Sequence, residues 1–424
     1  MRERGELTYC ANVHPGETLA AVLGHLRERI GAVRERRGLA WMASGLWLAA
    51  PVARELARNA GARAALAEAL AAAGVRLHTL NGFPYGGFHE ARVKEAVYRP
   101  HWADPRRLAY TLDLARVLTA LLPKDATEGT ISTLPLGFAR EWSEDLHQQA
   151  LDALCRLTEE LAALAEASGR RVRVCLEMEP GCVLERTGET ERLFADELPA
   201  AGRRRGTPTG ALAAHLGVCY DVCHQAVMFE PARESLGRLH AAGVAIGKVQ
   251  LSSALAVPDP GAPAARAALS EFDEPRYLHQ VRARTAAGGV AGVDDLPQAL
   301  ATPGLARDPW RVHFHLPVQA ETVAGGALAT TRAAIGEALD FLAAHPDVQP
   351  HLEVETYTWQ VLPVGLRPAD DAALVERIAA ELAWVEGEMQ GRGLLAPPAH
   401  AVTASAPGPA AAGTAVAARA AGRV

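Results

Sequence analysis

Short apolar runs alternate along the chain with longer stretches in which apolar residues recur at helical spacing. This alternation is typical of successive strand–helix units whose strands lie parallel in one buried sheet. Between the runs, segments such as 106–122 and 143–167 are rich in Ala, Leu, Glu and Arg and predict helices. We expect strands at 7–12, 45–48, 76–81, 129–134, 171–179, 216–221, 248–251, 311–317 and 352–356.

Nine predicted strands are one more than a closed (β/α)8 barrel, or TIM barrel, uses. Such a barrel takes about 250 residues and grows by insertions, so a chain of 424 residues suits one decorated barrel. Residues 253–310 are rich in Ala, Pro and Gly and show no clear strand–helix unit, which predicts an insertion after the seventh strand. The run 311–317 belongs either to that insertion or to the barrel, because the hydrophobic pattern fits both.

The sequence predicts neither an export signal nor a membrane span. The sequence opens with Met-Arg-Glu-Arg-Gly-Glu, which lacks the apolar stretch of an export signal, so we expect a cytoplasmic protein. The uncharged stretch 38–53 is shorter than the roughly 20 residues that cross a bilayer. Residues 394–424 consist largely of Ala, Pro, Gly and Thr without a hydrophobic period, which predicts a disordered tail after a domain of 1–393.

Composition narrows the class of partner. Hydrophobic residues make up 49% of the chain and charged residues 22%, which suits a globular protein with a large core. The formal net charge of −6 would repel nucleic-acid phosphates, so we expect no nucleic-acid partner. The six cysteines include no CxxC pair, and in a cytoplasmic protein they are expected to be buried thiols rather than disulfides.

Acidic and imidazole side chains gather where the later predicted strands end. The C-terminal ends of the strands form the active-site mouth of a (β/α)8 barrel. Glu179 ends the fifth run, Asp221 ends the sixth with His224 just beyond it, Gln250 lies in the seventh, His315 lies in 311–317, and Glu355 lies in the last run. Buried carboxylates are costly unless they are paired or bind a metal. Their convergence predicts about one divalent cation per chain, for which these ligand types suit Mg, Mn, Co or Zn.

Each of these residues also has a structural interpretation when it is taken alone. A strand-end Glu is as often a loop anchor or an ion-pair partner, and a single His is more often structural than a ligand. Glu177 and Glu353 fall one layer deeper, where we expect them to orient the outer ligands or to pair with a barrel cation such as Lys248. The joint pattern across five strand ends is what favours a metal site.

Aromatic and glycine-containing segments follow the first and third predicted strands, at 12–17, 81–88 and 93–102. At the mouth of the barrel they would form a pocket wall that excludes water and stacks on a small-molecule ligand. Ordinary loop packing explains any single aromatic residue equally well.

The order of these motifs resembles the xylose-isomerase-like TIM barrels, a superfamily of sugar and sugar-phosphate isomerases and epimerases, hydroxypyruvate isomerase and AP endonucleases. The shared order is Glu179-Pro180, Asp221-x-x-His224, a strand with Gln250 and a last strand with Glu355. More closely, five segments are similar to the metabolite traffic protein family called EboE. They are TYCANVHPGE at 8–17, ISTLP at 131–135, EPGCVL at 179–184, CYDVCH at 219–224 and EVETYTW at 353–359.

The resemblance implies a ligand set and a biological setting. By position, Glu179, Asp221, Gln250 and Glu355 match the four metal ligands of the isomerase branch, and His224 matches an imidazole that the superfamily often has. Gln250 follows the hydroxypyruvate-isomerase pattern, since the epimerases usually have His there. The family setting is a cytosolic barrel that works with a UbiA-like membrane protein to move a secondary-metabolite precursor; the oligomeric state stays open.

Three functions fit these observations. The first is a metal-dependent isomerase or epimerase for a small polyol, sugar or hydroxy-ketone, in which Glu179 and Glu355 move a proton. The second is a non-catalytic protein that binds a metabolite of the same pathway. The third is phosphoester hydrolysis like that of the AP endonucleases, which ranks last because it needs more histidine ligands than the sequence places at the mouth and a basic face that the composition does not indicate.

Overall fold

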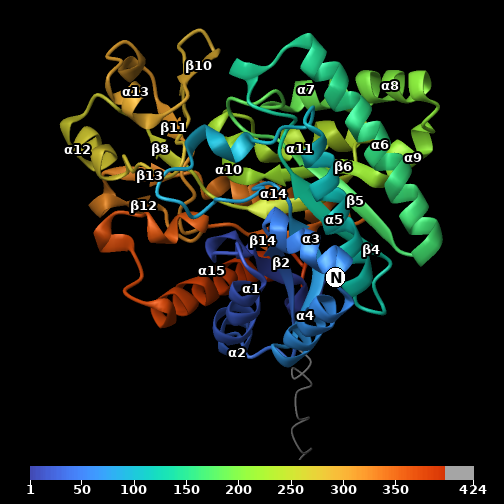
Figure 1. Cartoon of the computed structure of the whole chain (residues 1–424). Coiled ribbons are helices and arrows are strands. Elements are labelled where there is room, and N and C mark those ends of the chain that lie inside the picture. Colours follow the sequence, from blue (N-terminus) through green and yellow to red (C-terminus); the bar gives the residue numbers. More distant parts are fainter. Residues whose placement is uncertain (397–424) are drawn as a thin grey trace, which may run out of the picture.

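The computed structural model describes residues 1–396 of the chain. Within them, eight parallel strands form one sheet in the order β1-β14-β7-β6-β5-β4-β3-β2. A parallel bridge joins Cys10, just after β1, to Gly45 in β2 and nearly closes the sheet into a barrel (Figure 1). The strands are β1 (Leu7–Tyr9), β2 (Met42–Trp47), β3 (Val75–Asn81), β4 (Glu128–Thr133), β5 (Arg171–Glu177), β6 (Leu216–Asp221), β7 (Ile246–Leu251) and β14 (His351–Val354).

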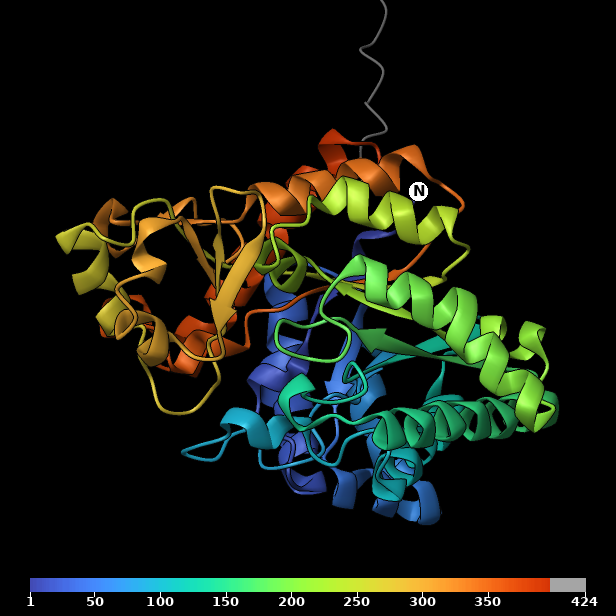
Figure 2. The ribbon, with the colours of Figure 1, turned by 90° about the horizontal axis from the view of Figure 1, so that it is seen from above.

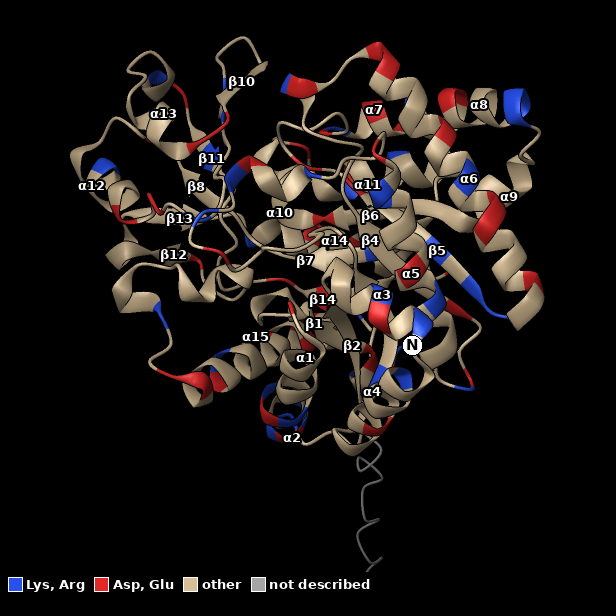
Figure 3. Ribbon diagram, viewed as in Figure 1, with Lys and Arg blue, Asp and Glu red and all other residues tan. Residues whose placement is uncertain are grey.

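Helices cover the outside of the barrel, as the long amphipathic stretches predict. Several begin at a side chain that accepts a hydrogen bond from the first turn, such as Asp104 before α5 and Ser143 before α6. Basic and acidic residues are interspersed over these helices (Figure 3). The main outer helices are α1 (Leu19–His25), α2 (Gly31–Arg36), α3 (Ala50–Arg58), α4 (Ala60–Ala72), α5 (Pro105–Leu121), α6 (Glu144–Ser168), α8 (Leu198–Arg205), α9 (Thr209–His215), α11 (Ala232–Ala241), α14 (Ala333–Ala344) and α15 (Asp371–Gly391).

A second, antiparallel sheet lies between β7 and β14 in the sequence and beside the barrel in space (Figures 1 and 2). Its strand order is β10-β9-β11-β8-β13-β12. The run 311–317 begins in β11, so it belongs to the insertion, and β14 is the eighth barrel strand. The elements are β8 (Leu255–Val257), α12 (Pro263–Glu271), β9 (Val281–Arg284), β10 (Val290–Val293), α13 (Leu296–Leu300), β11 (Trp310–Val312), β12 (Thr322–Val323) and β13 (Leu328–Thr330).

The predicted fold, a TIM barrel with an insertion after its seventh strand, is therefore confirmed. The insertion continues past residue 310, since β13 ends at Thr330. Strand ends differ by a few residues: the predicted run 171–179 stops being a strand at Glu177, and the run 45–48 begins earlier, at Met42. The first difference matters for the site, because it places Glu179 on the loop beyond β5 rather than in the sheet.

The last described residues pack against the start of the chain. The backbone N–H of Arg2 donates to the carbonyl of Leu394 at 2.9 Å, the N–H of Ala396 donates to the carbonyl of Arg2 at 2.8 Å, and Leu395 is buried. The remainder of the predicted tail, 397–424, lies outside the described residues. Among residues 1–396, no helix has both the length and the apolar character needed to cross a bilayer.

One ion pair lies deep inside the barrel. The Nζ of Lys248 is 2.6 Å from an oxygen of Glu353, and both side chains are 0% exposed. The expected pairing of Glu353 with Lys248 is thus confirmed. A Cβ atom on residue 45 would lie 1.5 Å from the other oxygen of Glu353, so only glycine leaves room for this carboxylate.

Candidate metal centre

The parallel register brings the predicted ligands to one end of the barrel. Asp221, the last residue of β6, is level with Gln250 in β7, and Gln250 is level with Glu353 in β14. Glu179 follows β5 by two residues, and Glu355 follows β14 directly. Because parallel strands present their C-terminal ends at one edge, these residues come from four strands to one mouth.

Three carboxylates lie against one another at the base of this mouth. Glu177, Asp221 and Glu355 each offer an oxygen within 4.8 Å of the other two, and all three are buried. Burial raises the pKa of Glu177 and Glu355 well above the ordinary value, and their mutual charges raise it further. Burial also opposes ionisation of Asp221, but His224, His315 and two hydrogen-bond donors hold the pKa of this group below its ordinary value. A divalent cation would relieve this repulsion.

Several buried polar atoms around the carboxylates have no hydrogen-bond partner. Both side-chain atoms of the Gln250 amide are in this state, as are Asp221 Oδ2, Glu177 Oε2 and His315 Nε2. Leaving such an atom unsatisfied costs about 1–3 kcal/mol. Apart from the Gln250 amide nitrogen, which is a donor, these atoms are oxygens and an imidazole nitrogen of the kinds that a cation takes as ligands. The residues present therefore fit a divalent metal.

The two glutamates with predicted proton-transfer roles are each held by a donor from another loop. The hydroxyl of Tyr98 donates to Glu179 Oε1 at 2.7 Å, and the amide of Asn12 donates to Glu355 Oε1 at 2.6 Å. Burial raises the pKa of Glu179, while His224 and the Tyr98 hydroxyl oppose that rise. The hydrogen bonds fix where each carboxylate points without consuming its second oxygen.

Glu177 is closer to the other carboxylates than its predicted supporting role implies. It groups with Asp221 and Glu355, whereas Glu179 groups with His224 and His313. Successive side chains of β5 point alternately into and out of the barrel, and Glu177 is one that points inward. Glu179 lies beyond the end of the strand, on the loop. Both glutamates line the same cavity.

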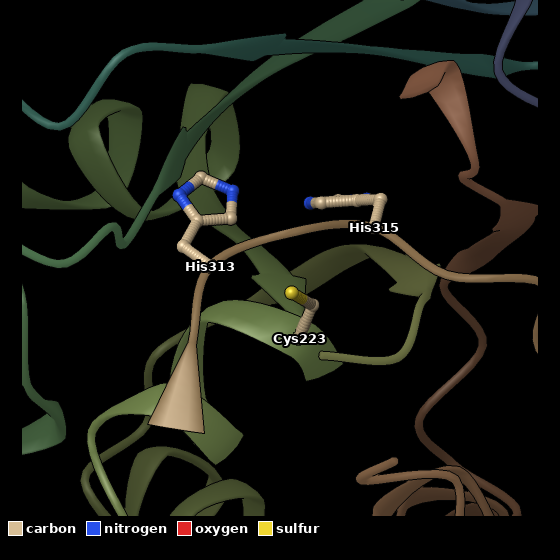
Figure 4. Close-up of side chains that lie close together, drawn as sticks. All are labelled: Cys223, His313 and His315. Carbon is tan, nitrogen blue, oxygen red and sulfur yellow. The ribbon is translucent and has the colours of Figure 1, made fainter. Parts of the chain in front are cut away.

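Three imidazoles converge beside the carboxylates. His224 is in α10 (Val222–Val227), directly after β6, while His313 and His315 lie on the segment that follows β11 (Figure 4). The ring centroids of His224 and His313 are 4.5 Å apart, and those of His224 and His315 are 5.5 Å apart. Burial lowers the pKa of His315 to about 4 and that of His313 well below its ordinary value, so both are neutral at pH 7.

The sequence predicted His224 and His315 as ligands but did not select His313. The signal was present, because His313 and His315 alternate in an extended segment and therefore share one side. His313 and Gln280, which the insertion supplies, reach the site only because the second sheet lies beside the mouth.

A narrow cavity of about 50 Å³ lies over the carboxylates. Its walls include Phe83 and Phe88, which lie in the predicted aromatic loops, and Tyr277 from the insertion. The cavity has room for only a few water molecules. A larger ligand therefore requires movement of the aromatic side chains that line it. The predicted pocket wall is thus confirmed for Phe83 and Phe88.

The loop after Glu355 is hydrogen-bonded to Glu381, a buried carboxyl group with a raised pKa. Glu381 in α15 accepts hydrogen bonds from the Thr356 hydroxyl at 2.7 Å and from the Trp359 indole at 3.0 Å, and burial raises its pKa from 4.5 to about 7. A raised folded-state pKa favours the protonated group, so the native state holds more protons than the unfolded state between pH 4.5 and pH 7.

We therefore expect Glu381 to make the free energy of unfolding fall as the pH rises from about 4.5 to about 7. The Glu381→Gln variant cannot titrate, so the difference between parent and variant should change by on the order of 3 kcal/mol across this window. Urea unfolding at pH 5 and pH 8 measures it. A difference that stays constant with pH would contradict the assigned shift.

Comparison with known proteins adds only distant structural neighbours. No family model and no curated protein matches the chain. An L-ribulose 3-epimerase is 12% identical, with 91% of this chain and 95% of that chain covered and a TM-score of 0.45. A D-tagatose 3-epimerase-like protein is 13% identical, with 90% and 98% covered and a TM-score of 0.44.

A third neighbour is a xylose isomerase-like TIM barrel protein from Mycobacterium smegmatis in complex with magnesium, 11% identical, with 92% and 100% covered and a TM-score of 0.45. The strand order and register of this chain define its class directly, as a TIM barrel with a cluster of carboxylates and imidazoles at its mouth.

Proposed function

We propose that the protein is a metal-dependent isomerase or epimerase that acts on a small polyol, sugar or hydroxy-ketone. The observation that carries this proposal is the group of buried carboxylates Glu177, Asp221 and Glu355. Glu177 and Asp221 each have a partnerless oxygen, and Glu177 and Glu355 line a cavity. A buried cluster of this charge is expensive without a cation, and proteins keep such clusters where chemistry needs them.

The resemblance assigns the cation to Glu179, Asp221, Gln250 and Glu355. Of these, Asp221 and Glu355 group with Glu177, whereas Glu179 groups with His224 and His313. A bound cation would hold adjacent oxygens of the substrate and polarise its carbonyl group. Phe83, Phe88 and Tyr277 line the cavity in which the reacting carbon would lie.

Glu179 and Glu355 would move the proton. They extend from β5 and β14, which are separated in the sheet by β6 and β7, and so they approach the cavity from different directions. Tyr98 and Asn12 each fix one oxygen of a glutamate and leave the other for the substrate. One glutamate would take a proton from the carbon next to the carbonyl, and the other would return it to the neighbouring carbon or to the opposite face.

Solvent-deuterium incorporation tests this function. The parent protein, loaded with Mn²⁺ or Mg²⁺, is incubated in D₂O with a panel of ketoses and hydroxy-ketones. We expect deuterium at the carbon next to the carbonyl, and a loss of about 10²–10⁴-fold in that rate for Glu179→Gln and for Glu355→Gln. Substrate affinity should fall less than the rate, because the lost interaction belongs to the transition state.

The exposed residue Glu376 provides a control, since Glu376→Gln should incorporate deuterium into the ligand at the same rate as the parent. Exchange that persists in both active-site variants would show that these glutamates do not carry the proton. No exchange with any compound, together with metal-dependent binding of one of them, would instead establish a binding protein.

That binding role is the second candidate, and the aromatic side chains that line a small cavity favour it. Its proposed setting follows from the segments similar to the EboE family: a cytoplasmic barrel that binds a metabolite on behalf of a UbiA-like membrane protein. The hydrolase function stays third, because the composition indicates no basic face for a nucleic-acid strand.

A further inference from the structure

A sulfur atom lies beside the imidazoles at the edge of the carboxylate site. Cys223, in α10, His313 and His315 each offer a ligand atom within 4.8 Å of the other two, and all three are buried. Figure 4 shows the Cys223 sulfur directed toward the two rings. This donor set differs from the oxygen-rich group of Glu177, Asp221 and Glu355.

The hydrogen bonds of the three histidines fix which ring nitrogen is free. Nδ1 of His224 faces the carbonyl of Met178 at 2.8 Å, and Nδ1 of His315 faces the carbonyl of Glu355 at 2.9 Å. A carbonyl only accepts, so both Nδ1 atoms carry a proton, and in a neutral ring the Nε2 atom then keeps a lone pair.

His313 follows the same rule through Gln280. Nδ1 of His313 lies 2.6 Å from Gln280 Oε1. The amide orientation is set by its nitrogen, which donates to the carbonyl of Pro180 at 2.9 Å and to Glu179 Oε1 at 3.3 Å. Nδ1 of His313 is therefore the donor, and its Nε2 also keeps a lone pair.

When both rings are neutral, these assignments leave two lone pairs face to face. Nε2 of His224 and Nε2 of His313 are 3.1 Å apart, and Nε2 of His315 is buried without a partner. Two neutral acceptors at that distance repel each other, whereas two nitrogen ligands of one tetrahedral Zn²⁺ lie about 3.3 Å apart at bond lengths of about 2.0–2.1 Å. Donation of each Nδ1 proton to an oxygen is also how proteins orient metal-binding imidazoles.

We propose that Cys223, His313 and His315 form the core of a second metal site, which His224 adjoins through His313 and which holds a zinc-class ion beside the oxygen-rich site. Thiolate and imidazole ligands favour Zn²⁺ over Mg²⁺ or Mn²⁺, which favour carboxylate and amide oxygens. His224 and His315, predicted from the sequence as ligands of a single ion, belong on this basis to a separate one. The site does not depend on the proposed isomerase activity.

Cobalt substitution tests the site without an activity assay. The full chain is stripped with a chelator and titrated with Co²⁺, and the near-ultraviolet charge-transfer band of a cobalt–thiolate bond is recorded together with metal content. We expect the band in the parent and two ions per chain at saturation. Cys223→Ser should abolish the band, lower Zn²⁺ affinity by about 100-fold or more, and leave one ion bound.

The matched control is Cys219→Ser, which replaces another fully buried thiol in the preceding strand and should keep the band. Glu355→Gln should also keep the band while it weakens the oxygen-rich site, so failure of one site is distinguishable from failure of the other. His313→Gln should lower Zn²⁺ affinity while the thiol stays intact. This variant tests the same site if Cys223→Ser does not fold. Absence of the band in the parent, or its persistence in Cys223→Ser, would overturn the proposal.

Discussion

Asp221→Asn is expected to lower the affinity of the protein for Mn²⁺ by roughly 100-fold or more while the barrel stays folded. Losing a residue that only orients a ligand already costs about 10–100-fold, and Asp221 is a proposed ligand. Its Oδ1 accepts from the His224 backbone at 2.9 Å and from the Ser252 hydroxyl at 2.8 Å, and the Asn oxygen can accept both bonds. Only the charge and the partnerless Oδ2 are lost.

Calorimetric titration of the metal-stripped protein with Mn²⁺ measures this change. Asp113→Asn is a suitable control, since Asp113 is a buried aspartate of α5 that pairs with Arg116 at the helix surface, away from the mouth. The control should bind like the parent. Parental affinity in Asp221→Asn, with an unchanged melting temperature, would remove Asp221 from the ligand set.

Lys248→Met is expected to lower the free energy of unfolding by about 3–5 kcal/mol. The substitution leaves Glu353 buried and charged with no cation beside it, in a space that Gly45 keeps open for the carboxylate. Removing both charges, in Lys248→Met with Glu353→Gln, should recover much of the loss, because no uncompensated charge then remains.

Urea unfolding of both variants, with Lys124→Met as the exposed control, measures this effect. The control should change the free energy of unfolding by less than about 0.5 kcal/mol. A loss in Lys248→Met no larger than that of the control would contradict the assignment of the pair as a buried structural element.

The strands were predictable because each barrel strand is a short buried run, and burial leaves a clear mark on sequence. Which sheet a run joins was not predictable. The segment 311–317 and the segment around β14 both have the pattern of a short strand. Yet β11 pairs antiparallel with β8 and β9, while β14 pairs in parallel with β1 and β7. Strand pairing depends on contacts between residues distant in sequence, which the local pattern does not contain.

In the candidate site too, some residues could be predicted from the local sequence and others depend on distant contacts. Asp221 and Glu355 could be found because strand ends converge in any barrel. The partners that orient the glutamates could not, since Asn12 is 343 residues from Glu355 and Gln280 belongs to the insertion. His313 was within reach from its alternation with His315, whereas its approach to Cys223 and His224 depends on how the second sheet meets α10.

The central claim, that strand-end side chains converge on a divalent cation, is tested most directly by anomalous diffraction from crystals grown with Mn²⁺. The account predicts a strong anomalous peak at the barrel mouth, within bonding distance of oxygens of Asp221 and Glu355 and of the Gln250 amide. A fully loaded crystal with no peak among these residues, or with manganese bound only at surface carboxylates, would contradict it.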